Sequence, residues 1–229
     1  MKLKDLEIFT VAPPFPGWGG RYWTFVKLTT DSGVVGYGEA YNATFGPHVT
    51  AKMIEDCAER YLVGRDPHDV ETFFRRAYNS GFSGRPDISM MGCVSALEIA
   101  CWDIIGKARN RPVWAMLGGK INERLRSYTY LYPAPGKESG EFWVSPDMAA
   151  EAALRFVDMG FTAVKFDPAG PYTIRGGHDP SGSDISRSAA FCKAIRDAGR
   201  DRADLLFGTH GQFNIAGAVR LAQAIEPYG

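Results

Sequence analysis

Alternating apolar and polar positions dominate the first 40 residues of the chain and predict strands. The alternation covers three segments, Lys4–Val11, Tyr22–Thr29 and Val34–Glu39. Between the second and third lies Asp31-Ser32-Gly33, a short glycine-containing turn of the kind that joins hairpin strands. The pattern therefore predicts a three-stranded antiparallel meander.

Helical spacing of apolar residues replaces this alternation after the meander. It predicts helices over Pro47–Tyr61, Asp69–Tyr78 and Met90–Lys107. The last of these is apolar around nearly its whole circumference, so we expect it to be buried on most sides. Pro112 begins a short helix that ends at Gly118-Gly119.

Three successive units, each a predicted strand followed by a predicted helix, come after Arg124. Short units of this kind predict parallel strands joined by right-handed crossovers. The third unit is the last, which would leave an apolar strand edge uncovered, so we expect the chain to be truncated. The predicted strands are Leu125–Tyr130, Thr162–Asp167 and Leu205–Thr209, and the predicted helices are Ser145–Met159, Asp184–Ala198 and Asn214–Ile225, with Ser145 and Asp184 as N-caps.

Charge and composition exclude several classes of partner. Lys plus Arg equals Asp plus Glu, so bulk charge would hold neither a nucleic acid nor an anionic membrane, although a few cations in one cleft could bind an anionic small molecule. No apolar run reaches about 18 residues, and the N-terminus does not read as a signal peptide. Four cysteines without a CxxC pair predict reduced core thiols in a cytoplasmic protein.

Two segments carry a resemblance to a known family. Ser95–Lys107, continuing through Pro112-Val113 to Leu117-Gly118-Gly119, resembles the capping-domain helix of the mandelate racemase and muconate lactonizing enzyme branch of the enolase superfamily. Gly36–Glu39 resembles the G-x-G-E that ends the N-terminal strands of this family. The resemblance implies an α+β capping domain over residues 1–122, followed over residues 123–229 by the first three β/α units of a modified α/β (TIM-type) barrel.

The resemblance also implies a reaction. Family members abstract the proton next to a carboxylate with the help of Mg²⁺ and a Lys or His base. We expect an acid-sugar dehydratase-like lyase that acts on a small carboxylate and forms homo-oligomers at full length. A racemase, epimerase or cycloisomerase shares the first step and stays open as an alternative, as does a non-catalytic or fragmentary family member.

Four positions at the ends of the second and third barrel strands match or depart from the family pattern. Lys165 matches the first lysine of K-x-K and would act on the carboxylate side or as base; its alternative role is a structural cation. Asp167 replaces the second lysine. Gly208 stands where the dehydratases have the metal-binding Asp of D-x-H-G, so Asp167 is the candidate metal ligand. His210 matches the histidine of that motif and is the candidate acid or base, unless it only caps the loop.

Further candidates for substrate binding lie in loops. Two aromatic, glycine-rich loops correspond to specificity loops of the capping domain and could act as a lid or pack on the barrel rim. The segment after the second barrel strand could meet an anionic substrate or be solvated. The candidates are Trp18, Tyr22, Tyr41 and Phe45 in the first two loops, and Arg175 and His178 in that segment.

Overall fold

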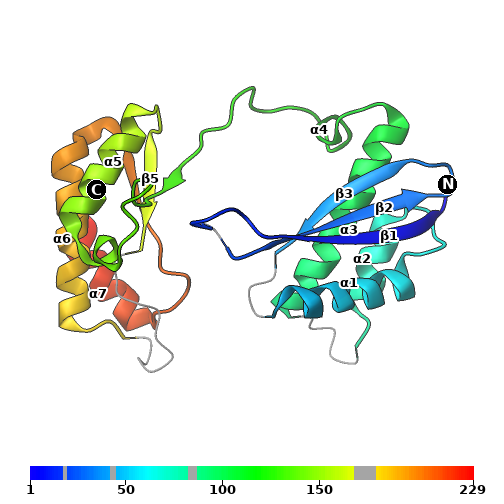
Figure 1. The fold of residues 1–229 in the computed structure, drawn as a ribbon, viewed down its shortest axis with the longest axis horizontal. Coiled ribbons are helices and arrows are strands. Elements are labelled where there is room, and N and C mark those ends of the chain that lie inside the picture. Colours follow the sequence, from blue (N-terminus) through cyan, green and yellow to red (C-terminus); the bar gives the residue numbers. More distant parts are fainter. Residues whose placement is uncertain (18–19, 42–44, 82–86, 168–178) are drawn as a thin grey trace. The chain divides into compact units, whose positions relative to one another are not determined.

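The computed structural model describes residues 1–229 except 18–19, 42–44, 82–86 and 168–178 (Figure 1). The chain forms two compact units, Met1–Glu123 (the first unit) and Arg124–Gly229 (the second unit). Three of the predicted site residues, Trp18, Arg175 and His178, lie outside the described residues.

The first unit is an antiparallel meander packed against helices. The predicted meander is confirmed, with the strands in the order β1-β2-β3. Gly33 in the β2–β3 turn has a φ of +83°, a conformation that favours glycine. The strands are β1 (Leu3–Val11), β2 (Trp23–Thr30) and β3 (Val35–Ala40), and the helices are α1 (Pro47–Tyr61), α2 (Val70–Tyr78), α3 (Ile88–Arg109) and α4 (Val113–Met116).

Helix α3 is the central element of the first unit and begins two residues before the predicted start. The Asp87 carboxylate caps it by accepting hydrogen bonds from the backbone N–H groups of Ser89 and Met90, at 2.8 and 2.9 Å. The helix is long and apolar enough to cross a membrane by length and composition alone. It packs on β3 and beside α1 and α2, however, which is the position of a core helix.

Two glycines of β3 allow α3 to approach the sheet closely. A Cβ atom on Gly36 would lie 2.1 Å from the carbonyl oxygen of Ala100, and one on Gly38 would lie 2.0 Å from that of Ala96. Asp103 of α3 also accepts a hydrogen bond from the backbone N–H of Tyr37, at 2.8 Å. The G-x-G segment and the helix therefore fit each other through backbone contact.

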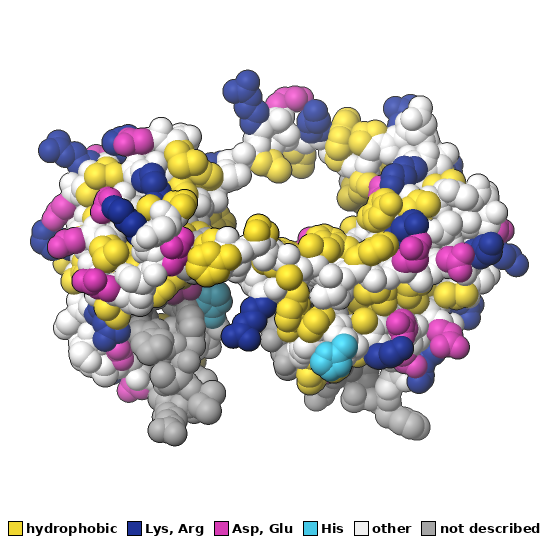
Figure 2. Space-filling view, viewed as in Figure 1, with side chains coloured by type: hydrophobic (Ala, Val, Ile, Leu, Met, Phe, Trp, Pro, Cys, Tyr) yellow, Lys and Arg dark blue, Asp and Glu magenta, His cyan; other side chains and the backbone are white. Residues whose placement is uncertain are grey.

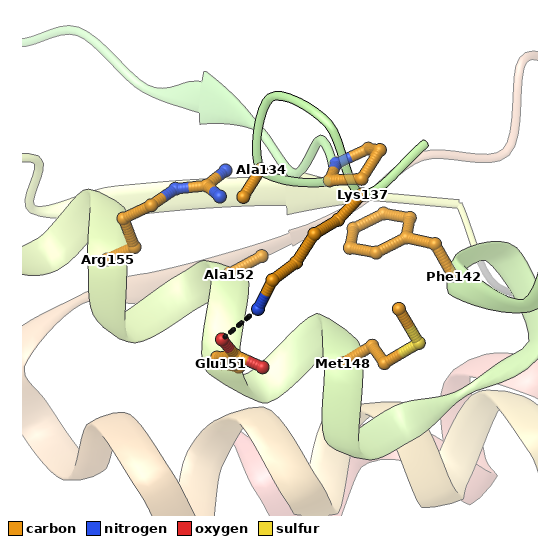
Figure 3. Close-up of a pocket in the computed structure, with 8 residues that line it drawn as sticks. Ala134, Lys137, Phe142, Met148, Glu151, Ala152 and Arg155 are labelled. Atoms are coloured by element: carbon orange, nitrogen blue, oxygen red, sulfur yellow. Dashed lines mark ion pairs between the residues drawn. The ribbon is translucent and has the colours of Figure 1, made fainter. Parts of the chain in front are cut away.

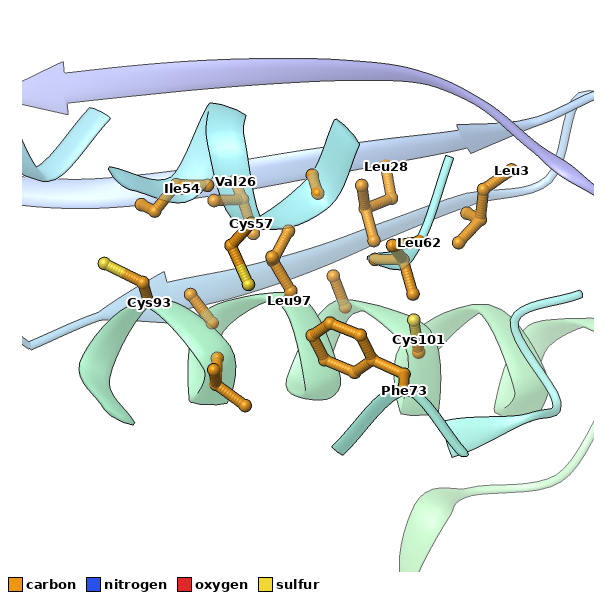
Figure 4. Close-up of a cluster of buried hydrophobic side chains, with 14 of the residues drawn as sticks. Leu3, Val26, Leu28, Ile54, Cys57, Leu62, Phe73, Cys93, Leu97 and Cys101 are labelled. Carbon is orange, nitrogen blue, oxygen red and sulfur yellow. The ribbon is translucent and has the colours of Figure 1, made fainter. Parts of the chain in front are cut away.

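Aliphatic, aromatic and cysteine side chains fill the core between the sheet and the helices (Figure 4). Val26 and Leu28 from β2 meet Ile54 from α1 and Leu97 from α3. All four cysteines of the chain are free and buried. They act here as small apolar side chains.

The second unit contains a parallel sheet in the order β4-β5-β6, as predicted. Among the described residues β6 pairs with β5 alone. The helices and strands of this unit enclose a second core, which includes Val164 and Phe166. The elements are β4 (Thr129–Tyr130), α5 (Pro146–Asp158), β5 (Ala163–Phe166), α6 (Gly182–Gly199), β6 (Asp204–Phe207) and α7 (Ile215–Ile225).

Two local predictions for the second unit were wrong. The first strand was expected to begin at Leu125, but its paired part is only Thr129–Tyr130. The segment before it is held by Arg126, whose side chain donates a hydrogen bond to the hydroxyl of Thr162 at 2.8 Å. Asp184 was expected as the N-cap of α6. Ser181 is the cap, and Asp184 completes a capping box at the third helical position, because its carboxylate reaches back to the Ser181 N–H at 3.1 Å.

Charges of both signs are interspersed over the described surface of each unit on the face that Figure 2 shows. Many form pairs along one helix, such as Arg75 with Glu71 and Lys107 with Asp103. Such exposed pairs contribute little to stability, about 0–1 kcal/mol each. They keep the surface polar without creating a field of one sign.

Candidate functional site

The parallel register of β5 and β6 places the ends of the two strands side by side. Phe166 pairs with Phe207, so Asp167 and Gly208 are the first residues beyond the paired segment on each strand. The backbone N–H of Gly208 donates to the carbonyl of Phe166 at 2.9 Å. Residues from the two strand ends can therefore act together at the carboxyl edge of the sheet.

Side-chain alternation along β5 separates core residues from site residues. Val164 and Phe166 are buried in the core of the second unit. Lys165 and Asp167 have the opposite parity and converge on Gly208: a Cβ atom built there would lie 1.6 Å from Oδ1 of Asp167 and 3.0 Å from Cε of Lys165. The K-x-D segment thus directs a cation and an anion towards the same point.

The carboxylate of Asp167 is the most buried charged group of this site, with a side chain only 6% exposed. Its Oδ2 lies 2.7 Å from Nε2 of His210. Its Oδ1 is buried and has no hydrogen-bond partner among the described residues. One oxygen of the carboxylate therefore holds the histidine, and the other can still accept a ligand.

His210 lies on the loop after β6, and its side chain is 56% exposed. Its backbone has a φ of +48°, in the left-handed region, and Gly211 follows with a φ of +68°. An ionised carboxylate can only accept, so Nε2 of His210 carries the proton in the contact with Asp167. In this tautomer the lone pair of the ring is on Nδ1.

Lys165 forms no ion pair among the residues that the structure describes. Its ammonium lies 5.8 Å from the centre of the Tyr128 ring, within the range of a cation–π contact. A lysine that faces a strand end without an acidic partner can bind an anion, such as a carboxylate.

Aromatic residues beside Asp167 were missed by the sequence prediction. The rings of Tyr130 and Tyr132 lie 5.1 Å apart, and the ring of Trp143 meets Tyr132 edge-on at 6.5 Å. Burial first, and then the charge of Asp167, raise the pKa of the Tyr132 phenol. The spacing of Tyr128, Tyr130 and Tyr132 was the signal in the sequence, since alternate residues of a strand share one face.

Two pockets lie near these residues. A narrow one is lined by Tyr130, Phe142, Trp143 and Asp167, among others. The other lies between α5 and the segment after β4, where Lys137 forms an ion pair with Glu151 at 3.6 Å (Figure 3). None of the predicted site residues lines this second pocket, so the K-x-D segment and His210 are separate from it.

The donor atoms of these residues determine whether they can hold Mg²⁺. A free, buried carboxylate oxygen is a ligand that Mg²⁺ prefers, and Oδ1 of Asp167 is such an atom. Within the described part of the chain no group of three or more His, Cys, Asp or Glu side chains could hold a metal. Asp167 thus fits as one ligand of a site that needs further oxygen atoms.

The three described loop candidates belong to the first unit. Tyr22, Tyr41 and Phe45 are 37%, 75% and 44% exposed. The backbone of Tyr41 is held close to α3, since a Cβ atom on Gly92 would lie 2.2 Å from its carbonyl oxygen. Their role in substrate binding stays a prediction.

Comparisons with known proteins match both units. Residues 19–118 match the family model "Mandelate racemase / muconate lactonizing enzyme, N-terminal domain", and residues 147–229 match "Enolase C-terminal domain-like". A mandelate racemase/muconate lactonizing enzyme from Sulfitobacter sp. has a crystal structure with a TM-score of 0.95 and 62% identity over 100% of this chain and 58% of that one. The crystal structure of such an enzyme from Jannaschia sp. CCS1 has a TM-score of 0.94 and 61% identity, and the match covers 100% of this chain and 59% of that one.

Relatives with named activities are more distant. D-gluconate dehydratase of Thermoproteus tenax is 33% identical over 90% of this chain and 39% of its own length. D-gluconate/D-galactonate dehydratase of Picrophilus torridus is 31% identical over 99% of this chain and 55% of its own. The chain therefore spans about half the length, or less, of these curated relatives.

Proposed function

Because the chain belongs to the mandelate racemase/muconate lactonizing enzyme branch of the enolase superfamily, we propose that it supplies the cap and first barrel strands of an acid-sugar dehydratase. Its substrate would be a polyhydroxy carboxylate, and its product a 2-keto-3-deoxy acid. The observation that carries the proposal is the cluster of Lys165, Asp167 and His210 at adjacent strand ends. A homo-oligomer in the cytoplasm stays a prediction.

His210 is the proposed acid–base group. Asp167 fixes the ring through Nε2, so Nδ1 would take the proton from the carbon next to the substrate carboxylate. The same nitrogen, once protonated, can deliver a proton to the hydroxyl that leaves from the neighbouring carbon.

Lys165 is the proposed partner of the substrate carboxylate. Loss of the α-proton places a second negative charge on that carboxylate, and a nearby ammonium stabilises this charge more than it stabilises the substrate. When bound, Mg²⁺ supplies further positive charge for the same purpose, and Asp167 would be one of its ligands.

A second candidate function is epimerisation or cycloisomerisation, which begins with the same proton transfer. The two functions differ in the product, because only dehydration forms a keto acid.

Product analysis separates the two candidates. The protein at its native length is incubated with Mg²⁺ and D-gluconate, D-galactonate or D-xylonate, and keto acid is measured as its semicarbazone. We expect keto acid from at least one acid with the wild type and none with Lys165→Ala. An epimer or lactone without keto acid would support the alternative, and no product from any acid would contradict both.

A further inference from the structure

Lys165 and Asp167 approach the same point but do not pair with each other. A Cβ atom at position 208 would lie 3.0 Å from Cε of Lys165 and 1.6 Å from Oδ1 of Asp167. Among the described residues, however, the carboxylate pairs with His210, and the ammonium of Lys165 forms no ion pair. Because opposite charges at short range attract each other, another contact must hold the ammonium away from this carboxylate.

The ring of Tyr128 provides such a contact. Nζ of Lys165 lies 5.8 Å from the ring centre, near the outer end of the range of about 6 Å for a cation–π contact. Tyr128 lies two residues before Tyr130, which pairs with Lys165, and residues two apart along a strand share a face. The ring is 52% exposed and is not part of the second core, so core packing does not explain its position.

The backbone that carries Tyr128 is anchored on both sides. Two residues earlier, Arg126 donates to the hydroxyl of Thr162 at 2.8 Å and forms an ion pair with Asp204 at 2.7 Å. The next residue, Thr129, begins the paired part of β4. The ring of Tyr128 is therefore attached to a fixed segment and can support a flexible side chain.

Two other lysines in the described part of the chain lie over aromatic rings, and both differ from Lys165. Lys107 lies 5.1 Å from the centre of the Tyr37 ring, and Lys120 lies 5.1 Å from that of the Trp114 ring. Each of these two also forms an ion pair with a carboxylate of its own segment, which offsets its charge. A ring holds an ammonium without neutralising it, so Lys165 keeps its full charge for an anion.

We propose that Tyr128 is a positioning residue, whose ring holds the ammonium of Lys165 in place and leaves its charge available to the substrate carboxylate. This inference rests on the proposed function, in which Lys165 binds that carboxylate. A lysine side chain loses rotational freedom when it is fixed, and a ring that fixes it beforehand spares substrate binding this cost. The gain is equal for the substrate and the transition state, so it lowers KM and leaves kcat unchanged.

Three replacements of Tyr128 in the protein at native length test the role of the ring. Tyr128→Leu removes the ring, and KM should rise about two- to fivefold with kcat unchanged, which is the roughly 0.5–1 kcal/mol of an exposed cation–π contact converted at about 1.36 kcal/mol per factor of ten. Tyr128→Phe keeps the ring and should give wild-type values. Pentafluorophenylalanine at position 128 keeps the ring but reverses the charge of its face, so it should behave like leucine.

Binding of each sugar acid is measured in parallel by isothermal titration calorimetry, in the His210→Gln background so that turnover is slow. Kd should follow the same order as KM. In a Lys165→Ala background, Tyr128→Leu should cause no further loss, because the ring acts only through the ammonium. Tyr37→Leu is the matched control, since Tyr37 is also 52% exposed and its ring lies over Lys107; it should leave Kd unchanged.

An unchanged Kd in Tyr128→Leu, or an equal loss with and without Lys165, would overturn the inference. Weaker binding in Tyr128→Phe as well would also overturn it, because the hydroxyl and not the ring would then be responsible. Keto acid formation with an unchanged Kd in Tyr128→Leu would leave the proposed function standing without the inference. A Kd that follows the ring, without product from the wild type, would do the reverse, and a wild type that binds none of the acids would contradict both.

Discussion

Substitution of Gly38 by alanine tests the close approach of α3 to the meander. The added Cβ atom would lie 2.0 Å from the carbonyl oxygen of Ala96 and 3.1 Å from the backbone nitrogen of Ala100. Non-bonded heavy atoms settle at about 3.5 Å, so the helix would have to move away from β3 by about 1.5 Å. Both neighbours are backbone atoms of one helix, and no side chain can rotate to make room.

The loss of stability caused by Gly38→Ala follows from the packing that this movement of the helix would disturb. Overpacking a core costs typically about 1–3 kcal/mol, and the backbone clash places Gly38→Ala at the upper end, at about 3 kcal/mol. Replacing glycine also reduces the conformational freedom of the unfolded chain, which stabilises the folded state by about 0.4–1 kcal/mol. We therefore expect the first unit to lose about 2–3 kcal/mol, a large share of the roughly 5–15 kcal/mol that holds a domain together.

Thiol labelling in urea measures this loss in each unit separately. Cys57, Cys93 and Cys101 are buried in the first unit and Cys192 in the second, so each reacts with iodoacetamide when its own unit opens. Mass spectrometry of the peptides then gives two midpoints from one sample. Gly38→Ala should lower the midpoint of the first unit and leave that of Cys192 unchanged.

Gly81→Ala is the matched control within the first unit, because a Cβ atom there meets no atom of the described residues within 4 Å. A substitution at such a position should change stability by no more than about 0.5 kcal/mol. If Gly38→Ala shifted the first midpoint no more than this control, the backbone contact between α3 and β3 would not be a packing constraint, and the reasoning would be refuted.

Three further predictions concern the cap of α3, the proposed acid–base group and the buried thiols. Asp87→Ala removes two hydrogen bonds at the start of α3 and should destabilise the first unit by about 1 kcal/mol in the same urea titration. His210→Gln should lower kcat by about 10²- to 10⁴-fold, with an unchanged melting temperature because the side chain is more than half exposed; a lower melting temperature with wild-type kcat would contradict the proposed role. Burial raises the pKa of the three thiols of the first unit from an ordinary 9.0 to about 11 or about 12. The unfolded thiols therefore ionise first, so the melting temperature of this unit should fall as the pH rises above about 9, and three Cys→Ala substitutions should reduce that slope.

The elements of the fold could be predicted from periodicity and turn residues. The meander follows from alternation around Asp31-Ser32-Gly33, and α3 from an apolar run too long for a strand. The exact N-cap residue of α6 could not be predicted, because Ser181 and Asp184 are both good capping residues and only the hydrogen bonds decide between them. The extent of β4 was overestimated, since pairing depends on where β5 begins and not on the local sequence.

The sequence predicts the candidate site only through the residues that end the predicted strands. Lys165, Asp167 and His210 were found because K-x-D and G-x-H-G end predicted strands. The mutual contact of Asp167 and His210, and the occupation of the space at Gly208, depend on register and could not be read from the sequence. Tyr132 lies beyond the predicted strand, so the effect of the Asp167 charge on its phenol could not be read from the strand pattern.

Exchange of the substrate α-proton tests the central claim most directly, because every candidate reaction of this site begins with it. The protein at native length, with Mg²⁺ and each sugar acid in D₂O, is followed by proton NMR beside a Lys165→Ala/His210→Gln double variant. The account predicts that the wild type removes the α-proton signal of at least one acid, either by exchange for deuterium or by formation of a keto acid that carries deuterium at C3. The variant should do neither. Exchange that persists in the double variant, or an unchanged signal for every acid in the wild type, would contradict it.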